Sequence, residues 1–107
     1  MYVRATRILA DPAKAAADRT ASYQAMVASM KNVDGFQGAL LLMHWSSGNS
    51  LGLTFWENEE KLRASEEVAD RFRREGANVI GATTPPSVER FEVVYYGVPE
   101  PSSVRRG

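Results

Sequence analysis

The chain has 107 residues and a mass of 11.8 kDa, which suits a single domain built around one hydrophobic core. Thirteen Lys and Arg residues balance thirteen Asp and Glu residues, so the formal net charge is +0 at pH 7. This balance argues against nucleic acids and membrane surfaces as partners, because both attract basic proteins. With no cysteine and one histidine, the chain cannot form disulfides, thiolate metal sites or a cysteine nucleophile. We therefore expect no bound metal and no bound cofactor.

Two further features bear on organisation and location. No apolar run approaches the roughly 18 residues that a membrane span needs, and the N-terminal segment has arginines within its apolar run. A cytoplasmic protein is therefore expected. Residues 1–98 are predicted to form the domain, and residues 99–107, rich in Pro, Ser and Arg, are predicted to be a flexible tail.

The first third of the chain predicts a strand followed by a helix. Residues 2–9 alternate between two faces, which is typical of a half-buried strand. Asp11 then offers a helix N-cap, and Pro12 suits the first helical position. Small and apolar residues recur at spacings of three and four through residues 13–30, which indicates an amphipathic helix. A turn at residues 32–35 is expected to end it.

The middle of the chain predicts a hairpin. Residues 36–45 are apolar on both faces, which is typical of a strand covered on both sides. A two-residue turn at 48–49 would pair Ser47 with Ser50 and lead into a returning strand over residues 51–56. The faces predicted by this register hold Leu41, Met43, Thr54 and Trp56 on one side and Leu40, Leu42, His44, Leu53 and Phe55 on the other.

The last part of the chain predicts a second helix and a final strand. Asn58 is a helix cap followed by acidic residues, and Gly76 is the expected stop. The buried stripe of this helix is predicted to be Leu62, Ser65, Ala69 and Phe72. The arginines near its end, Arg71, Arg73 and Arg74, are interpreted as a solvated face rather than a phosphate site. The last strand is predicted over residues 88–98.

The order strand-helix-strand-strand-helix-strand is that of the ferredoxin-like α+β fold, with a four-stranded antiparallel sheet covered by two helices on one face. The strands are nevertheless apolar on both faces. A soluble monomer seldom exposes so large an apolar surface. We therefore expect a homodimer that pairs through the uncovered sheet face.

Several segments resemble the antibiotic biosynthesis monooxygenase-like family of the dimeric α+β barrel superfamily. They are YVRATRIL, DGFQGALLL, LTFWENEEKLRASEE and PPSVERFEVVYY, with most weight on Gly35-Phe36, Gly38 and Trp56 before a capped acidic helix. The resemblance implies a ferredoxin-like domain that pairs into a dimeric α+β barrel. It also implies a cofactor-independent monooxygenase that oxidises a small aromatic, quinol or polyketide-type substrate with O2. The alternative is a non-catalytic domain of the same fold that binds a small ligand or a partner.

The resemblance directs attention to aromatic and polar residues near the strand ends. Trp56 could wall an aromatic pocket, or it could be a core or dimer-interface residue. Tyr23 could offer its hydroxyl to a ligand, or it could simply pack in the core. Asn58 could hydrogen-bond an oxyanion, although its position already fits a helix cap.

Two charged or titratable residues complete the candidates. His44 is the natural general base because its unperturbed pKa lies near neutrality, but an exposed structural histidine is the alternative. Arg4 could pair with a substrate anion, or it could form an ion pair with Glu89 or Glu92 across the sheet.

Haem degradation, an activity of another branch of the superfamily, is disfavoured. That branch has an asparagine on the first strand and a histidine on the second helix as iron ligand. Here residues 2–9 contain no asparagine, and residues 58–76 contain no histidine.

Overall fold

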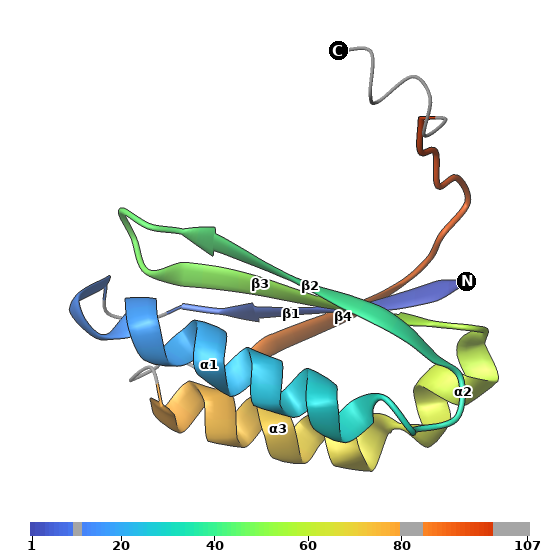
Figure 1. Ribbon diagram of the computed structural model, residues 1–107, viewed down its shortest axis with the longest axis horizontal. Coiled ribbons are helices and arrows are strands. Elements are labelled where there is room, and N and C mark those ends of the chain that lie inside the picture. Colours follow the sequence, from blue (N-terminus) through green and yellow to red (C-terminus); the bar gives the residue numbers. More distant parts are fainter. Residues whose placement is uncertain (10–11, 80–84, 100–107) are drawn as a thin grey trace.

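The computed structural model describes residues 1–9, 12–79 and 85–99, with side chains described outside 12–19 and 75–79. The elements are β1 (Tyr2–Ile8), α1 (Pro12–Met30), β2 (Phe36–His44), β3 (Asn49–Trp56), α2 (Glu59–Ala64), α3 (Glu66–Val79) and β4 (Ser87–Glu92). The strands form one antiparallel sheet in the order β2-β3-β1-β4, and α1 and α3 pack against one of its faces (Figure 1). The predicted ferredoxin-like fold is confirmed.

The alternation of residues along β1 and β3 separates two faces of the sheet. Register pairs such as Arg4 with Thr54 place both residues on the side of the helices, whereas Val3 with Phe55 lie on the other side. We call these the covered face and the open face. The covered face of the two strands holds Tyr2, Arg4, Thr6, Ile8, Ser50, Gly52, Thr54 and Trp56. These assignments match the alternation predicted for residues 2–9 and 51–56.

The hairpin between β2 and β3 differs from the predicted two-residue turn. His44 pairs with Asn49, so residues 45–48 form the loop and Met43 pairs with Ser50 rather than with Thr54. The amides of Ser47 and Gly48 both donate to the carbonyl of His44, at 3.2 and 2.9 Å, and Gly48 takes a φ of 77°. The predicted pairing of Ser47 with Ser50 is therefore wrong. The predicted faces survive because the partner changes by an even number of residues.

The second helix is interrupted, although the sequence predicts one continuous helix. It breaks at Ser65, whose amide and hydroxyl both donate to the carbonyl of Leu62, at 3.2 and 2.7 Å. This carbonyl also accepts a bond from Arg4, so it is drawn away from the helical ladder. The predicted stop at Gly76 is wrong, because α3 continues to Val79. One glycine costs a helix only about 1 kcal/mol, which packing readily offsets.

The last strand is shorter than predicted. The amide of Val93 donates to the carbonyl of Met1 at 2.8 Å. The segment 94–98 leaves the sheet, and Figure 1 shows it rising away from the open face. Its large side chains are exposed, including Val94 at 87% and Tyr95 at 85%. The strand predicted to reach residue 98 therefore ends at Glu92.

The core lies where α1, α2 and the paired ends of β1 and β3 meet. Its fully buried members are Trp56, Met30 and Leu62, and the ring of Phe36 meets Trp56 edge-on with centroids 5.4 Å apart. The helix predicted after Pro12 begins at that residue, whereas the expected cap Asp11 lies outside the described residues. Within the described ranges, no helix is both long and apolar enough to cross a membrane.

Candidate functional site

A cavity of about 180 Å³ lies between the covered face and the two long helices. The strands β1 and β3 form its floor, and α1 and α3 form its walls. Apolar wall residues include Met26, Met30 and Phe72, whereas the floor carries Arg4 and Thr54. Ser29 lines the cavity and is exposed, so the cavity reaches the surface along α1. An apolar recess with a few convergent polar groups is the usual form of a small-molecule site.

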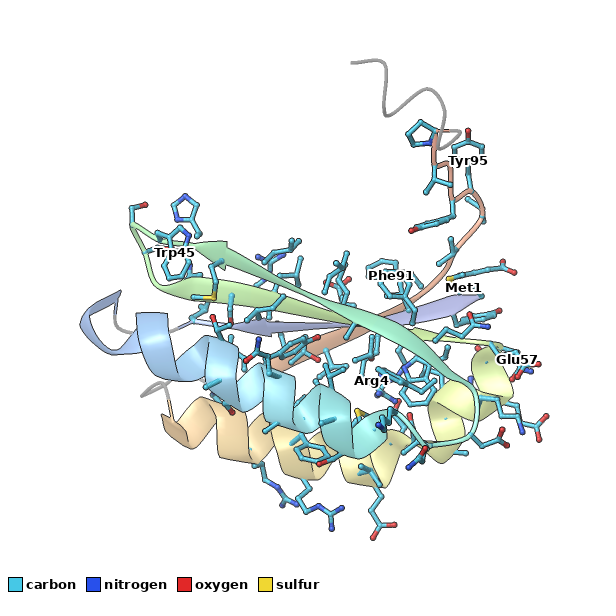
Figure 2. All side chains as sticks on the ribbon, viewed as in Figure 1. Met1, Arg4, Trp45, Glu57, Phe91 and Tyr95 are labelled. Atoms are coloured by element: carbon cyan, nitrogen blue, oxygen red, sulfur yellow. The ribbon has the colours of Figure 1, made fainter. Side chains whose placement is uncertain are left out.

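Arg4 is the charged group at the centre of this floor. Its side chain is only 2% exposed, and Figure 2 shows it on the helix side of the sheet. Nη2 donates to the carbonyl of Leu62 and to Oγ of Ser65, both at 2.8 Å, and lies 3.2 Å from Glu66 Oε1. Nε and Nη1 are buried without a partner among the described residues. Buried N–H groups nearly always have a hydrogen-bond partner, so two that lack one in the protein are suited to donating to a bound ligand.

The carboxylate of Glu66 is shared between two arginines. Arg90 donates to both of its oxygens, at 2.6 and 2.8 Å, and Arg4 contacts the first oxygen. The hydrogen bonds from Arg90, followed by the charge and hydrogen bond of Arg4, lower the pKa of Glu66 to about 2. Burial lowers the pKa of Arg4, and Glu66 opposes this shift. Because Arg90 takes much of the carboxylate, Arg4 keeps uncompensated positive charge.

Tyr23 enters the same cavity from α1. Its hydroxyl lies 3.0 Å from the carbonyl oxygens of both Leu40 and Leu53, so its proton is directed at the sheet backbone. The ring packs against Gly52, where a Cβ would sit 3.1 Å from the ring carbon Cε1. A larger residue at position 52 would require the ring to shift. The phenol is thus held as a donor against the sheet.

Trp56 lies behind the site rather than in its lining. It is 0% exposed, and the guanidinium carbon of Arg4 lies 5.5 Å from its ring centroid, within the range of a cation–π contact. Its indole Nε1 donates to Thr54 Oγ1 at 3.0 Å. The Thr54 hydroxyl lines the cavity, and accepting this bond leaves its own proton to donate. Trp56 therefore acts on the cavity through Arg4 and Thr54.

The other two predicted site residues lie elsewhere. His44 is at the end of β2 on the open face, where its Nδ1 lies 2.8 Å from Ser47 Oγ at the exposed hairpin. Asn58 caps α2, with its Oδ1 accepting from the amide of Lys61 at 2.9 Å. Neither lines the cavity. The structure thus brings Tyr23 and Arg4 together in one cavity, with Trp56 behind it.

The predicted ion pair of Arg4 is wrong in its partner. Glu89 sits opposite Ala5 on the open face, and Glu92 sits opposite Tyr2 at the edge of the sheet. The partner is Glu66, which the break in the helix at Ser65 brings over β1.

Arg73 is a cavity residue that sequence reasoning missed. The arginines of α3 were predicted to be a solvated face, but the side chain of Arg73 is only 14% exposed. Its Nη2 lies 3.2 Å from Asp70 Oδ1, while Nη1 is buried without a partner among the described residues. The available signal was its position four residues after Ala69, at the edge of the predicted buried stripe.

No protein-family model and no curated protein sequence matches the chain. Solved structures do. A Streptomyces coelicolor monooxygenase from the gene ActVA-Orf6, in complex with nanaomycin D, is 16% identical with a TM-score of 0.69, covering 92% of each chain. A mutant of SnoaB, a cofactor-independent oxygenase from Streptomyces nogalater, is 15% identical with a TM-score of 0.64, covering 92% of this chain and 97% of the other.

A haem-degrading protein has the same fold. MhuD of Mycobacterium tuberculosis, with two haems bound in its active site, is 25% identical with a TM-score of 0.65, covering 90% of this chain and 99% of MhuD. These likenesses establish the fold, and the resemblance predicted from the sequence is confirmed at that level.

Proposed function

We propose that this chain, which has the fold of the antibiotic biosynthesis monooxygenases, is a cofactor-independent monooxygenase. Its substrate is a small aromatic, quinol or polyketide-type molecule that binds in the cavity and is oxidised by O2. The observation that carries the proposal is the buried guanidinium of Arg4, which presents unpartnered N–H groups to a largely apolar cavity. The likeness to SnoaB, a cofactor-independent oxygenase, and to the Streptomyces coelicolor monooxygenase supports oxygen chemistry on this fold.

Arg4 would promote ionisation of the substrate. A fixed positive charge in a water-poor cavity lowers the pKa of a nearby phenol or enol, because it stabilises the anion. The Thr54 hydroxyl adds a second donor from the floor. The proton passes to solvent, since the carboxylate of Glu66 is held by two arginines and the one histidine lies on the other face. Tyr23 and the apolar wall would orient the ring.

The electrons for oxygen activation come from the ionised substrate itself. The substrate anion passes one electron to O2, and the resulting radical and superoxide combine through a new C–O bond. The peroxide takes up a proton, and loss of water leaves a carbonyl group. For a methylene carbon the balance is CH2 plus O2 giving C=O plus H2O, with no external reductant. The part of the protein is to stabilise the anion and to exclude bulk water.

The second candidate is a non-catalytic binder that uses the same cavity. The placement of Tyr23 favours it, because the hydroxyl proton is already engaged by backbone carbonyls. Oxygen uptake with an anthrone and a naphthoquinol separates the two. A monooxygenase is expected to accelerate uptake, and Arg4→Gln to reduce this rate by about tenfold or more.

The control for this experiment monitors binding without turnover. A Trp45→Phe background removes the exposed indole, so the remaining fluorescence reports Trp56 beside Arg4. Saturable quenching by the naphthoquinol with no uptake above the uncatalysed rate would establish the binder and overturn the monooxygenase. Equal rates in Arg4→Gln and in the unsubstituted protein would remove Arg4 from the mechanism.

The cavity does not fit haem. No histidine lines it, and the hydroxyl of Tyr23 must keep its proton to bond the carbonyls of Leu40 and Leu53. The described residues also include no group of three or more side chains suited to a metal ion. Haem degradation, the activity of MhuD, therefore forms no part of the proposal. Adding haemin and recording the Soret band tests this, and no shift is expected.

The proposal includes a homodimer formed through the open face. That face carries half-buried or exposed apolar side chains from three strands, namely Leu40, Leu42, Leu51, Leu53, Phe55 and Phe91. Leu40, Leu42 and Phe91 are 50%, 48% and 48% exposed, which is unusual for large apolar residues on one face of a sheet. A second copy would present the same face, so the contact would be self-complementary.

A further inference from the structure

Two arginines line the same cavity, Arg4 from the floor and Arg73 from the wall. Arg4 on β1 leaves Nε and Nη1 unpartnered, and Arg73 on α3 leaves Nη1 unpartnered. The positive charge of Arg73 adds to the effect of burial in lowering the pKa of Arg4, so the two guanidinium groups repel each other. Among the described residues that line the cavity, the buried side-chain atoms without a partner are therefore nitrogen donors of two arginines, whereas the fourth such atom, Oγ of Ser50, lies outside the lining.

The neighbouring carboxylates do not neutralise these cations. Glu66 is divided between Arg4 and Arg90. Asp70 is divided between Arg73 and Arg74, at 3.2 and 3.4 Å, and is 51% exposed. Each carboxylate therefore serves one buried and one more exposed arginine, and the buried pair retains an excess of positive charge. A single anion placed between Arg4 and Arg73 would satisfy donors from both.

The size of the cavity limits the rest of the ligand. A protein cavity of about 150 Å³ holds benzene. The cavity here is about 180 Å³, which allows one aromatic ring with a small substituent. Phe72 and Met26 supply apolar wall for the ring. A fused three-ring molecule would have to extend out between α1 and α3.

We propose that the cavity selects a single aromatic ring bearing an anionic oxygen group, held between Arg4 and Arg73. Either a ring carboxylate or an ionised ring hydroxyl supplies this chemistry. The inference rests on the proposed function, and it narrows the substrate from polycyclic polyketides to monocyclic aromatic anions. Arg73 becomes the residue that selects for charge from the wall of the cavity, while Arg4 holds the same anion from the floor.

Calorimetric titration with matched probes tests charge and size without requiring turnover. Benzoate and para-nitrophenolate represent the two sources of anionic oxygen, and comparing them tells which one binds. Benzamide is a neutral molecule of the same size as benzoate, and anthracene carboxylate carries the same charge on three rings. We expect at least one of the monocyclic anions to bind, and both benzamide and anthracene carboxylate to bind about tenfold or more weakly.

Variants then locate the anion. Arg73→Gln should weaken binding of the monocyclic anion about tenfold or more. Arg74→Gln is the matched control, because Arg74 lies on the same helix and contacts the same Asp70 but is 72% exposed. The affinity of this variant for the monocyclic anion should stay within about twofold of that of the unsubstituted protein. Arg4→Gln should also weaken binding. Because Arg4 is embedded in the fold, Arg73→Gln is the deciding variant, with circular dichroism checking that it folds.

Specific outcomes overturn the inference. They are no binding of either monocyclic anion, equal affinity for benzamide and benzoate, tighter binding of anthracene carboxylate, or unchanged affinity in Arg73→Gln. The proposed function fails separately. Binding of a monocyclic anion without oxygen consumption by any aromatic substrate would retain the inference and reject the monooxygenase, whereas anthrone oxidation with no anion binding would do the reverse.

Discussion

The covered and open faces of the sheet use the same strands for different purposes. On the covered face, the helices bury Trp56 completely and cover Arg4. Because water screens a buried charge less, the charge of Arg4 interacts more strongly with nearby groups than an exposed charge would. On the open face, Leu42 and Phe91 lie half exposed. Figure 2 shows Arg4 and Phe91 on opposite sides of the same sheet. The covered face therefore combines charged and polar groups with burial, whereas the open face leaves large apolar side chains exposed.

Strict alternation makes this division possible. Residues adjacent in the chain, such as Phe55 and Trp56, point to opposite faces, so each strand can specify both surfaces independently. The polar groups that serve the cavity, Arg4 and Thr54, pair directly across β1 and β3. Substitutions that change one face and leave the other intact test whether the two faces have separate roles.

The largest effect is expected from adjacent truncations on β3. Trp56→Ala should cost about 3–5 kcal/mol in the free energy of unfolding, because it removes a fully buried ring from the core. Phe55→Ala should cost less in dilute solution, since its side chain is only partly buried within the chain. Urea denaturation measures both. If the open face is an interface, the cost of Phe55→Ala should grow with protein concentration and that of Trp56→Ala should not. Equal costs at all concentrations would erase the distinction between the faces.

The next effect concerns assembly alone. Leu42→Arg would place a charge in the middle of the open face of each copy, and we expect it to raise the dimer dissociation constant about 100-fold or more. Light scattering coupled to size exclusion should show a change from twice the 11.8 kDa chain mass to the single chain mass. Gln24→Arg, on the exposed side of α1, adds the same charge and is the control. A monomeric unsubstituted protein at micromolar concentration would contradict the dimer itself.

The fold followed from the sequence because its main determinants are local. Alternation over residues 2–9 and 51–56 specified the sheet faces, and Pro12 marked the start of α1. Some errors have a different cause, because they depend on contacts between distant segments. The helix breaks at Ser65 partly because Arg4, 58 residues before Leu62, donates to the Leu62 carbonyl. The hairpin error is local instead, since the amides of Ser47 and Gly48 both donate to the carbonyl of His44 and close a longer loop.

The candidate site was predictable only in part, for the same reason. Tyr23 and Arg4 could be chosen because the family resemblance directs attention to aromatic and polar residues near the strand ends, and Tyr23 also lies on the predicted stripe of its helix. Arg73 carries the same charge as the neighbouring Arg71 and Arg74, and only its position four residues after Ala69 distinguishes it in the sequence. Which nitrogen atoms of Arg4 and Arg73 lack a hydrogen-bond partner can be seen only in the three-dimensional structure.

The smallest effect tests whether the ion pairs of the covered face add stability. Glu66→Gln should lower the free energy of unfolding by about 1–2 kcal/mol at neutral pH, because it removes the charge that Arg4 and Arg90 share. The glutamate pKa falls from 4.5 to about 2 in the folded protein. The stabilisation is therefore fully present above pH 4.5 and is lost as the pH falls toward 2.

Denaturation curves of the two proteins across this pH range should accordingly converge at the acidic end. The matched control is Glu67→Gln, since Glu67 is the exposed neighbour of Glu66 and none of the ion pairs found among the described residues involves it. A pH-independent difference for Glu66→Gln would mean that the side chain stabilises through packing alone.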